Sequence, residues 1–163
     1  MRFLVHPAAL AAGSLAALAA AFAFQHLGGL EPCPLCIWQR WPHLAIALLA
    51  VVSLGFRGTA AAVPVGLAGL AALAGAGLAG FHVGVEQQWW AGLEACAGGP
   101  PAETVAELRQ RLLNAAPARC DEAAWSFLGL SMAAWNGLLS LALAGMAAGA
   151  LRRKVPAMRS RAA

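Results

Sequence analysis

Charged residues are scarce in this sequence. Only 11% of its 163 residues are charged, whereas 61% are hydrophobic, and the mean hydropathy is +0.69. A soluble domain carries charge on about a quarter of its residues. The shortage excludes an ordinary soluble protein, argues against a separate soluble domain, and indicates an integral membrane protein. Tyrosine is absent, and cysteine occurs four times.

Four stretches are apolar enough to cross a bilayer, which requires about 20 mainly apolar residues per helix. They comprise residues 8–24, 37–56, 60–81 and 125–151. The turn 57–59 is so short that the second and third spans must be antiparallel neighbours. Residues 25–36 form a short loop and residues 82–124 the one long loop. We therefore expect an all-α membrane protein, a single domain (1–163) built as a four-helix transmembrane bundle with the long loop between helices 3 and 4.

The distribution of charge predicts the orientation of this bundle. Seven basic residues fall on one side of the spans: Arg2, Arg57, Arg152, Arg153, Lys154, Arg159 and Arg161. Four others and all seven acidic residues fall on the opposite side. By the positive-inside rule, both termini and the turn 57–59 are cytoplasmic, and the two longer loops with all four cysteines face outward. The basic excess fits anionic lipid rather than nucleic acid.

Three features of the sequence have two interpretations each. Residues 8–24 fit a first span and also the apolar core of a cleaved signal peptide, whose loss would leave three spans. Residues 103–113 fit a short amphipathic helix, which lies either on the membrane surface or packed within the loop. Small residues recur every four positions at Ala72, Ala76, Gly80 and Gly84. That spacing permits close helix packing in lipid, and chance explains it as readily in a chain so rich in alanine and glycine.

The motif Cys33-x-x-Cys36 stands where a loop enters the second span. Pro34 suits the first position of a helix, so Cys33 falls near the N-cap and Cys36 in the first turn. A helix N-terminus favours the reactive thiolate. Arg40 follows Cys36 by one turn and adds a positive charge, although an arginine here also fits snorkelling to the interface. His43, one turn deeper, fits packing or a hydrogen bond, and alternatively a proton carrier.

Cys96 and Cys120 enclose 23 residues of the long loop. In an oxidising compartment such a pair forms a disulfide. A plain structural staple would explain these two cysteines but would leave Cys33 and Cys36 without a purpose. Four thiolates also suit zinc, but only one of the two pairs has the two-residue gap typical of zinc sites. We expect a Cys96–Cys120 disulfide and no metal.

Two pairs of cysteines on one membrane face indicate a redox relay. Two disulfides connected by thiol exchange can accept electrons from an external dithiol at the loop and pass them to the pair beside the membrane. The sequence has neither a haem signature nor a flavin fold to carry the electrons further. A lipid-soluble quinone that reaches Cys36 and Arg40 from the bilayer is the expected acceptor.

The sequence contains two distinctive segments: Phe24-Gln25-His26 with Glu31-Pro32-Cys33-Pro34-Leu35-Cys36-Ile37-Trp38-Gln39-Arg40, and Phe127-Leu128-Gly129-Leu130-Ser131-Met132. Both resemble the DsbB family of inner-membrane thiol:quinone oxidoreductases. The resemblance covers nearly the whole chain. It implies a multi-pass protein of the bacterial inner membrane with periplasmic cysteines. It also implies a periplasmic DsbA-like thioredoxin-fold oxidase as partner and a membrane quinone as cofactor, with ubiquinone favoured over menaquinone.

The resemblance also implies a role for each cysteine. Cys33 and Cys36 form the disulfide coupled to quinone, and Cys96 and Cys120 form the loop disulfide. The partner thiolate attacks Cys96. Cys120 then exchanges with Cys33 and frees Cys36, whose thiolate attacks the quinone ring or donates charge to it.

Two further residues take a quinone-binding role from the resemblance. Arg40 holds the thiolate of Cys36 and steadies the reduced quinone oxygen, and His82 matches a histidine associated with quinone use. Glu86 takes the same role or is a solvated loop residue. The sequence departs from the family pattern at Trp38, where tyrosine is expected, and at Gln39, where an acidic residue is common.

Two other functions remain alternatives. A vitamin K epoxide reductase-like thiol oxidoreductase also uses a CxxC motif and loop cysteines, but places its CxxC in a different helix order. A non-enzymatic membrane adaptor would hold two static disulfides whose cysteines never turn over.

Overall fold

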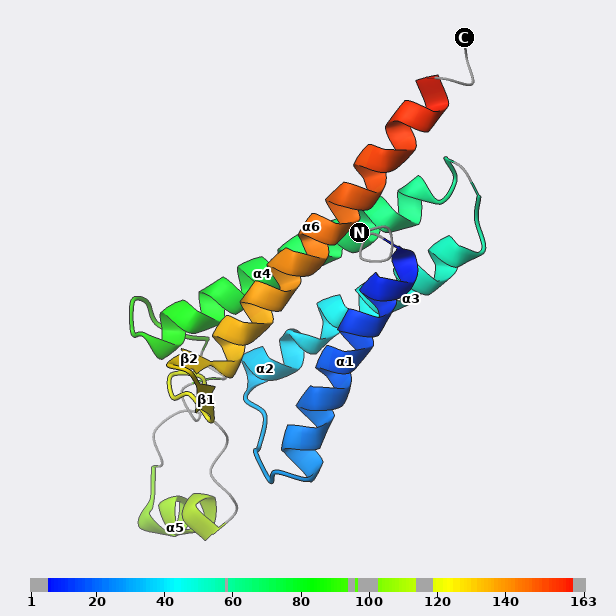
Figure 1. The fold of residues 1–163 in the computed structure, drawn as a ribbon. Coiled ribbons are helices and arrows are strands. Elements are labelled where there is room, and N and C mark those ends of the chain that lie inside the picture. Colours follow the sequence, from blue (N-terminus) through cyan, green and yellow to red (C-terminus); the bar gives the residue numbers. More distant parts are fainter. Residues whose placement is uncertain (1–5, 58, 94–95, 97–102, 114–118, 160–163) are drawn as a thin grey trace.

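The computed structural model describes residues 6–57, 59–93, 96, 103–113 and 119–159. In these parts of the chain, four helical segments are long and apolar enough to cross a membrane: Pro7–His26, Pro34–Leu54, Ala62–Glu86 and Met132–Arg152. They lie alongside one another as a bundle (Figure 1). The predicted four-helix membrane fold, with its long loop between the third and fourth spans, is confirmed.

The first span is α1 (Pro7–His26), two residues longer at its end than expected. It begins at His6, whose side chain accepts a hydrogen bond from the Ala8 backbone N–H, and Pro7 occupies the first position, where a proline is favoured. The helix ends before Gly28-Gly29, where Gly29 adopts a φ of 66°. A positive φ suits glycine, and it terminates the helix.

The second span is interrupted at Gln39, between α2 (Pro34–Trp38) and α3 (Arg40–Leu54). Pro42 explains the break. It has no backbone N–H to donate to the carbonyl of Trp38 four residues earlier, and its ring crowds that carbonyl. The span also starts three residues before the expected residue 37, because Cys33 caps it.

The third span, α4 (Ala62–Glu86), continues five residues past its expected end at residue 81. His82 and Glu86 are therefore helical residues one turn apart, and the expectation that they belong to the long loop is wrong. The apolar run simply continues through Val83 and Val85, so neither polar residue interrupts the helix.

The fourth span, α6 (Met132–Arg159), begins seven residues later than the expected residue 125. The preceding apolar residues instead form an antiparallel hairpin of β1 (Ser126–Phe127) and β2 (Leu130–Ser131). Its two turn residues, Leu128 and Gly129, have φ values of 52° and 76°. Positive φ at both positions is what a tight two-residue hairpin turn requires, so hydropathy alone misplaced this boundary.

The bundle core lies between α4, α6, α3 and α1. Its fully buried apolar residues include Leu10, Ile46, Val65 and Leu143. On α4 the buried small residues are Ala68, Ala72, Gly75, Ala79 and Gly84. The repeat from Ala72 to Gly84 is therefore not a packing stripe as a whole, since a Cβ on Gly80 would meet nothing within 4 Å.

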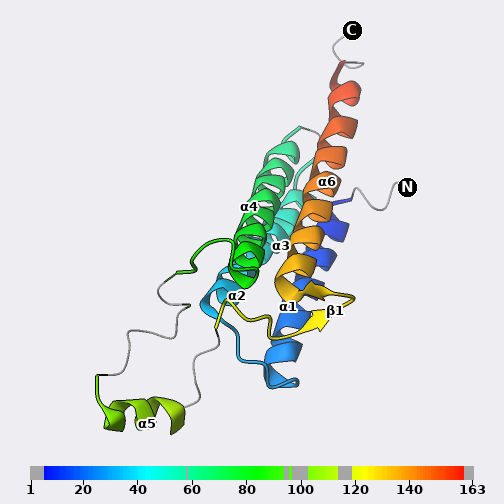
Figure 2. The same ribbon diagram turned by 90° about the vertical axis from the view of Figure 1, so that its left-hand side faces the viewer.

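A short helix, α5 (Val105–Leu113), lies beyond one end of the bundle, clear of the spanning helices (Figure 2). The hairpin lies at the same end. This is also the end at which the functional side chains gather.

Candidate functional site

Cysteines from three separate segments meet at the end of the bundle that carries the hairpin. Cys33, Cys96 and Cys120 are buried in one cluster with Leu35 and Val85, and Cys36 packs against it. Cys96 and Cys120 form a disulfide with a Cα–Cα distance of 5.1 Å. The cluster therefore places the loop disulfide against the motif that caps the second span.

Cys33 and Cys36 are free thiols in this structure. The Cys33 Sγ accepts a hydrogen bond from the Cys36 backbone N–H at 3.2 Å, and the Sγ atoms of the two cysteines lie 2.9 Å apart, within hydrogen-bonding distance. The expected Cys33–Cys36 disulfide therefore describes the oxidised form of this pair and stays a prediction. The thiol of Cys36, with a smaller contribution from His82, lowers the pKa of Cys33 to about 5, although burial opposes the shift.

The Cys33 and Cys36 sulfurs and a ring nitrogen of His82 lie within 4.8 Å of one another, which raises the question of a metal. Two thiolates on one tetrahedral zinc, with bonds of about 2.3 Å, stand about 3.8 Å apart. The Sγ–Sγ distance of 2.9 Å is well below that separation. The spacing suits thiol exchange better than metal binding.

His82 faces the cysteine pair from α4. Its side chain is 3% exposed, and its Nε2 lies 3.6 Å from the Cys33 Sγ and 3.9 Å from a carboxylate oxygen of Glu86. Glu86 also accepts a hydrogen bond from the hydroxyl of Ser131. The two polar residues at the end of α4 are therefore held between the cysteine motif and the hairpin.

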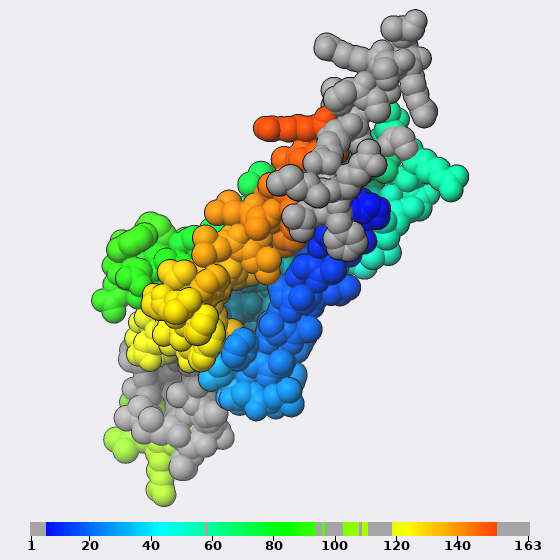
Figure 3. Space-filling view, viewed as in Figure 1, coloured from blue at the N-terminus to red at the C-terminus, as the bar shows by residue number. Residues whose placement is uncertain are grey.

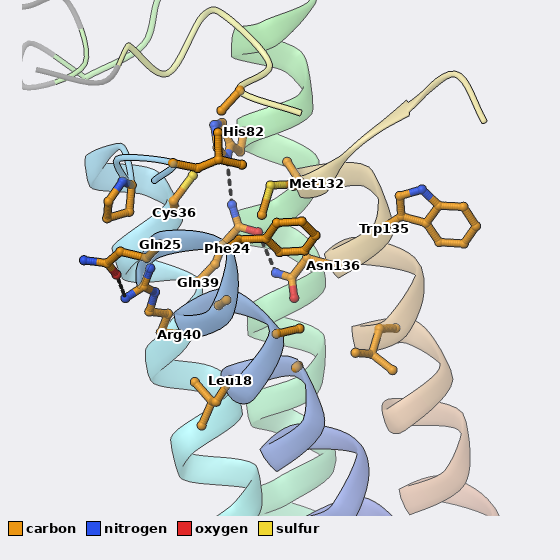
Figure 4. A pocket seen from close by; sticks show the side chains of 18 of the residues that line it. Leu18, Phe24, Gln25, Cys36, Gln39, Arg40, His82, Met132, Trp135 and Asn136 are labelled. Carbon is orange, nitrogen blue, oxygen red and sulfur yellow. Dashed lines mark hydrogen bonds between the residues drawn. The ribbon is translucent and has the colours of Figure 1, made fainter. Parts of the chain in front are cut away.

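A chain of hydrogen bonds leads from His82 into the bundle (Figure 4). The His82 Nδ1 lies 2.6 Å from the Gln39 amide nitrogen, and the Gln39 oxygen accepts from Asn136 at 2.5 Å. The Asn136 oxygen lies 2.6 Å from the His43 Nε2. Asn136 was missed in the sequence, although an amide within an apolar span is itself a signal of a buried polar contact.

Arg40 reaches toward α1. It donates a hydrogen bond to the Gln25 side-chain oxygen at 2.7 Å, and its guanidinium lies 4.8 Å from the centre of the Phe22 ring. The expectation that Arg40 holds Cys36 is thus not what this geometry displays. The two residues share a cavity instead, and the buried Nε of Arg40 has no hydrogen-bond partner there.

That cavity has a volume of about 210 Å³. Its walls come from α1, α6 and the Cys36–Arg40 segment and are mostly apolar, with contributions from Leu18, Phe24, Met132 and Leu139. The space-filling view shows a hollow between α1 and α6 (Figure 3). The expected residues Cys36, Arg40 and His82 all line it, together with Gln39 and Asn136.

Comparison with known proteins places the chain in a family. Residues 5–150 match the family described as "Disulfide bond formation protein DsbB". A "Disulfide bond formation protein B" of Methylococcus capsulatus is 35% identical over 74% of this chain and 76% of its own length. Proteins with the same description from Marinobacter nauticus and Aromatoleum aromaticum are 37% and 36% identical, over 74% and 69% of this chain and 75% and 70% of theirs.

No solved structure matches the chain. The match over residues 5–150 agrees with the four spans, the capped CxxC motif and the loop disulfide described above. The chain belongs to the DsbB family and is a disulfide-generating oxidoreductase of the membrane.

Proposed function

We propose that this protein is a thiol:quinone oxidoreductase of the bacterial inner membrane. It takes two electrons and two protons from a periplasmic DsbA-like dithiol and delivers them to a membrane quinone. The partner becomes a disulfide and the quinone a quinol. The observation that carries the proposal is the cavity that joins Cys36 to Arg40 directly beside the buried cysteine cluster.

The cavity fits a quinone head group. A dry cavity of about 150 Å³ holds a benzene ring, so about 210 Å³ leaves room for ring substituents. Arg40 lines the cavity and supplies a charged donor for a ring oxygen. When bound, the quinone supplies a two-electron acceptor.

The cysteine cluster supports the order of the relay. The partner thiolate attacks Cys96, forms a mixed disulfide and releases the Cys120 thiolate. Cys120 attacks Cys33 of an oxidised Cys33–Cys36 pair and releases the Cys36 thiolate into the cavity. The partner's second thiol then attacks the mixed disulfide and releases Cys96 as a thiolate. Cys96 attacks Cys120 in the Cys120–Cys33 disulfide, which re-forms the loop disulfide and releases the Cys33 thiolate. The electron pair then rests on Cys33 and Cys36 until it leaves for the acceptor.

The test supplies a reduced DsbA-like protein and a short-chain quinone to the purified protein and follows quinone absorbance. We expect steady turnover by the wild-type chain and none by Cys36→Ser, because the serine oxygen cannot form the disulfide. Arg40→Gln should raise the KM for quinone by at least about tenfold, the loss expected for one charged hydrogen bond.

Ser140→Ala is the matched control, since Ser140 is buried on α6 without lining the cavity. Equal quinone reduction by wild type and Cys36→Ser, or none by either, would refute the proposal. The second result would favour an adaptor with static disulfides.

A further inference from the structure

We propose that Gln39, Asn136 and His43 act as a positioning chain. It fixes the tautomer of His82 so that the His82 Nε2–H donates to the sulfur of Cys33. The inference deepens the proposed function and rests on it for its effect on turnover, but its test needs neither quinone nor partner.

The direction of the chain follows from its donors and acceptors. Asn136 donates through its amide nitrogen to the Gln39 oxygen, so the Gln39 nitrogen is the group left to donate to His82 Nδ1. A neutral histidine that accepts at Nδ1 carries its proton at Nε2. That proton points to Cys33, whose Sγ lies 3.6 Å from the His82 Nε2.

The inner end of the chain supports the same direction. The Asn136 oxygen accepts from His43, so the His43 Nε2 carries the proton. The His43 Nδ1 is buried with no partner, and in this tautomer it is a bare lone pair. The reversed chain would require a buried Nδ1–H without an acceptor, which is among the rarer and costlier defects in folded proteins.

The outer end agrees. Besides Cys33, the His82 Nε2 faces Glu86, whose carboxylate can only accept when ionised. An unprotonated His82 Nε2 would face the Glu86 carboxylate with no hydrogen between the two acceptors. Glu31, Arg119 and Glu122 line the small hollow beyond Cys33 and Cys36, together with His82 and Glu86.

This series of hydrogen bonds orients His82 but conducts no proton, because the side-chain amides of Gln39 and Asn136 keep their hydrogens. The orientation of His82 matters for Cys33, because Cys33 leaves as a thiolate when the Cys96–Cys120 disulfide forms again. A donor held at the sulfur stabilises the departing charge. Gln39, Asn136 and His43 are accordingly positioning residues.

The first measurement is nitrogen NMR of the full-length protein with labelled histidine. The chain has four histidines, so His43 and His82 are assigned by single substitution. We expect both to carry the proton at Nε2. A proton on Nδ1 of His82 in the wild-type protein would overturn the proposal without any variant being needed.

The second measurement is the thiolate absorbance of the reduced Cys33–Cys36 pair against pH, with the loop disulfide intact. Asn136→Leu removes both amide contacts and should move the first midpoint upward by roughly one unit, the effect of a weakened hydrogen bond to a charged group. Ser140→Ala, one turn along the same helix, should leave the midpoint in place.

An unchanged or lower midpoint in Asn136→Leu would contradict the proposal. Repeating the titration in Cys36→Ser assigns the first step to Cys33. Failure of the quinone assay with these results intact would instead reject the proposed function alone.

Discussion

At the scale of single residues, the structure and the family resemblance place negative charge on different sulfurs. In the reduced pair, the Cys33 Sγ accepts a hydrogen bond from the Cys36 backbone N–H, and its lowered pKa favours the thiolate on Cys33. The resemblance gives the working thiolate to Cys36. These are two states of one cycle: once Cys33 is joined to Cys120, its sulfur no longer competes for the charge.

The lowered pKa of Cys33 predicts a break in the reduction potential of the Cys33–Cys36 pair near pH 5. A thiolate stabilises the reduced pair above that pH, and this stabilisation disappears as the pH falls through the pKa. Reduction then takes up two protons below about pH 5 and one above it. The potential should change by about 59 mV per pH unit below the break and about 30 mV above it.

Equilibration with a redox buffer across this range measures both slopes. The loop pair Cys96–Cys120 is an internal comparison, because ordinary thiols stay protonated to about pH 8 and keep the steeper slope. A single slope of about 59 mV per unit for the Cys33–Cys36 pair would contradict the prediction.

At the scale of elements, hydropathy predicted which segments span and misplaced some of their ends. The Trp125–Leu130 stretch is as apolar as a helix, and only the turn residues Leu128 and Gly129 separate it as a hairpin. The break before Pro42 could be predicted from the sequence, because a proline in a helix removes a hydrogen bond four residues back. The contact of Gln39 with His82 could not be predicted, since it joins residues 43 positions apart.

The turn after α4 depends on Gly84. A Cβ at this position would overlap the Trp90 ring, which stacks on Phe81 and donates its indole N–H to the Phe81 carbonyl. Gly84→Ala should therefore displace the ring and destabilise the protein by about 1–3 kcal/mol. Thermal unfolding in detergent, followed by tryptophan fluorescence, measures the effect.

Gly80→Ala is the matched control on the same helix, because its Cβ would meet nothing within 4 Å. It should be neutral or stabilising by up to about 1 kcal/mol, the usual gain of alanine over glycine in a helix. Equal effects of the two substitutions would show that Trp90 does not constrain Gly84.

At the scale of the whole molecule, the sequence predicted that the four cysteines share one end, and the structure adds how closely they sit. The loop that contains Cys96 and Cys120 was expected to face outward, yet these two residues are only 4% and 0% exposed. Burial depends on contacts between distant segments, which a single sequence does not contain. A partner that attacks Cys96 must therefore first displace part of this cluster.

Charge predicts the sidedness of the whole bundle. The turn between α3 and α4, which contains Arg57, and the C-terminal part of α6, which contains Arg152, lie at the end of the bundle opposite α5 (Figure 1). A reporter enzyme that works only outside the cytoplasm should be inactive when fused after α6 and active when inserted between α4 and α5. Activity of the first fusion and silence of the second would reverse the proposed orientation.

The hollow between α1 and α6 has a consequence for kinetics (Figure 3). A quinone that enters through it arrives from the hydrocarbon phase, so its working concentration is counted per lipid molecule and not per volume of water. Adding empty lipid should slow turnover even though total quinone is unchanged, whereas adding buffer should not. If quinone is the acceptor, as we propose, the bilayer is the reservoir that sets how fast the site is refilled.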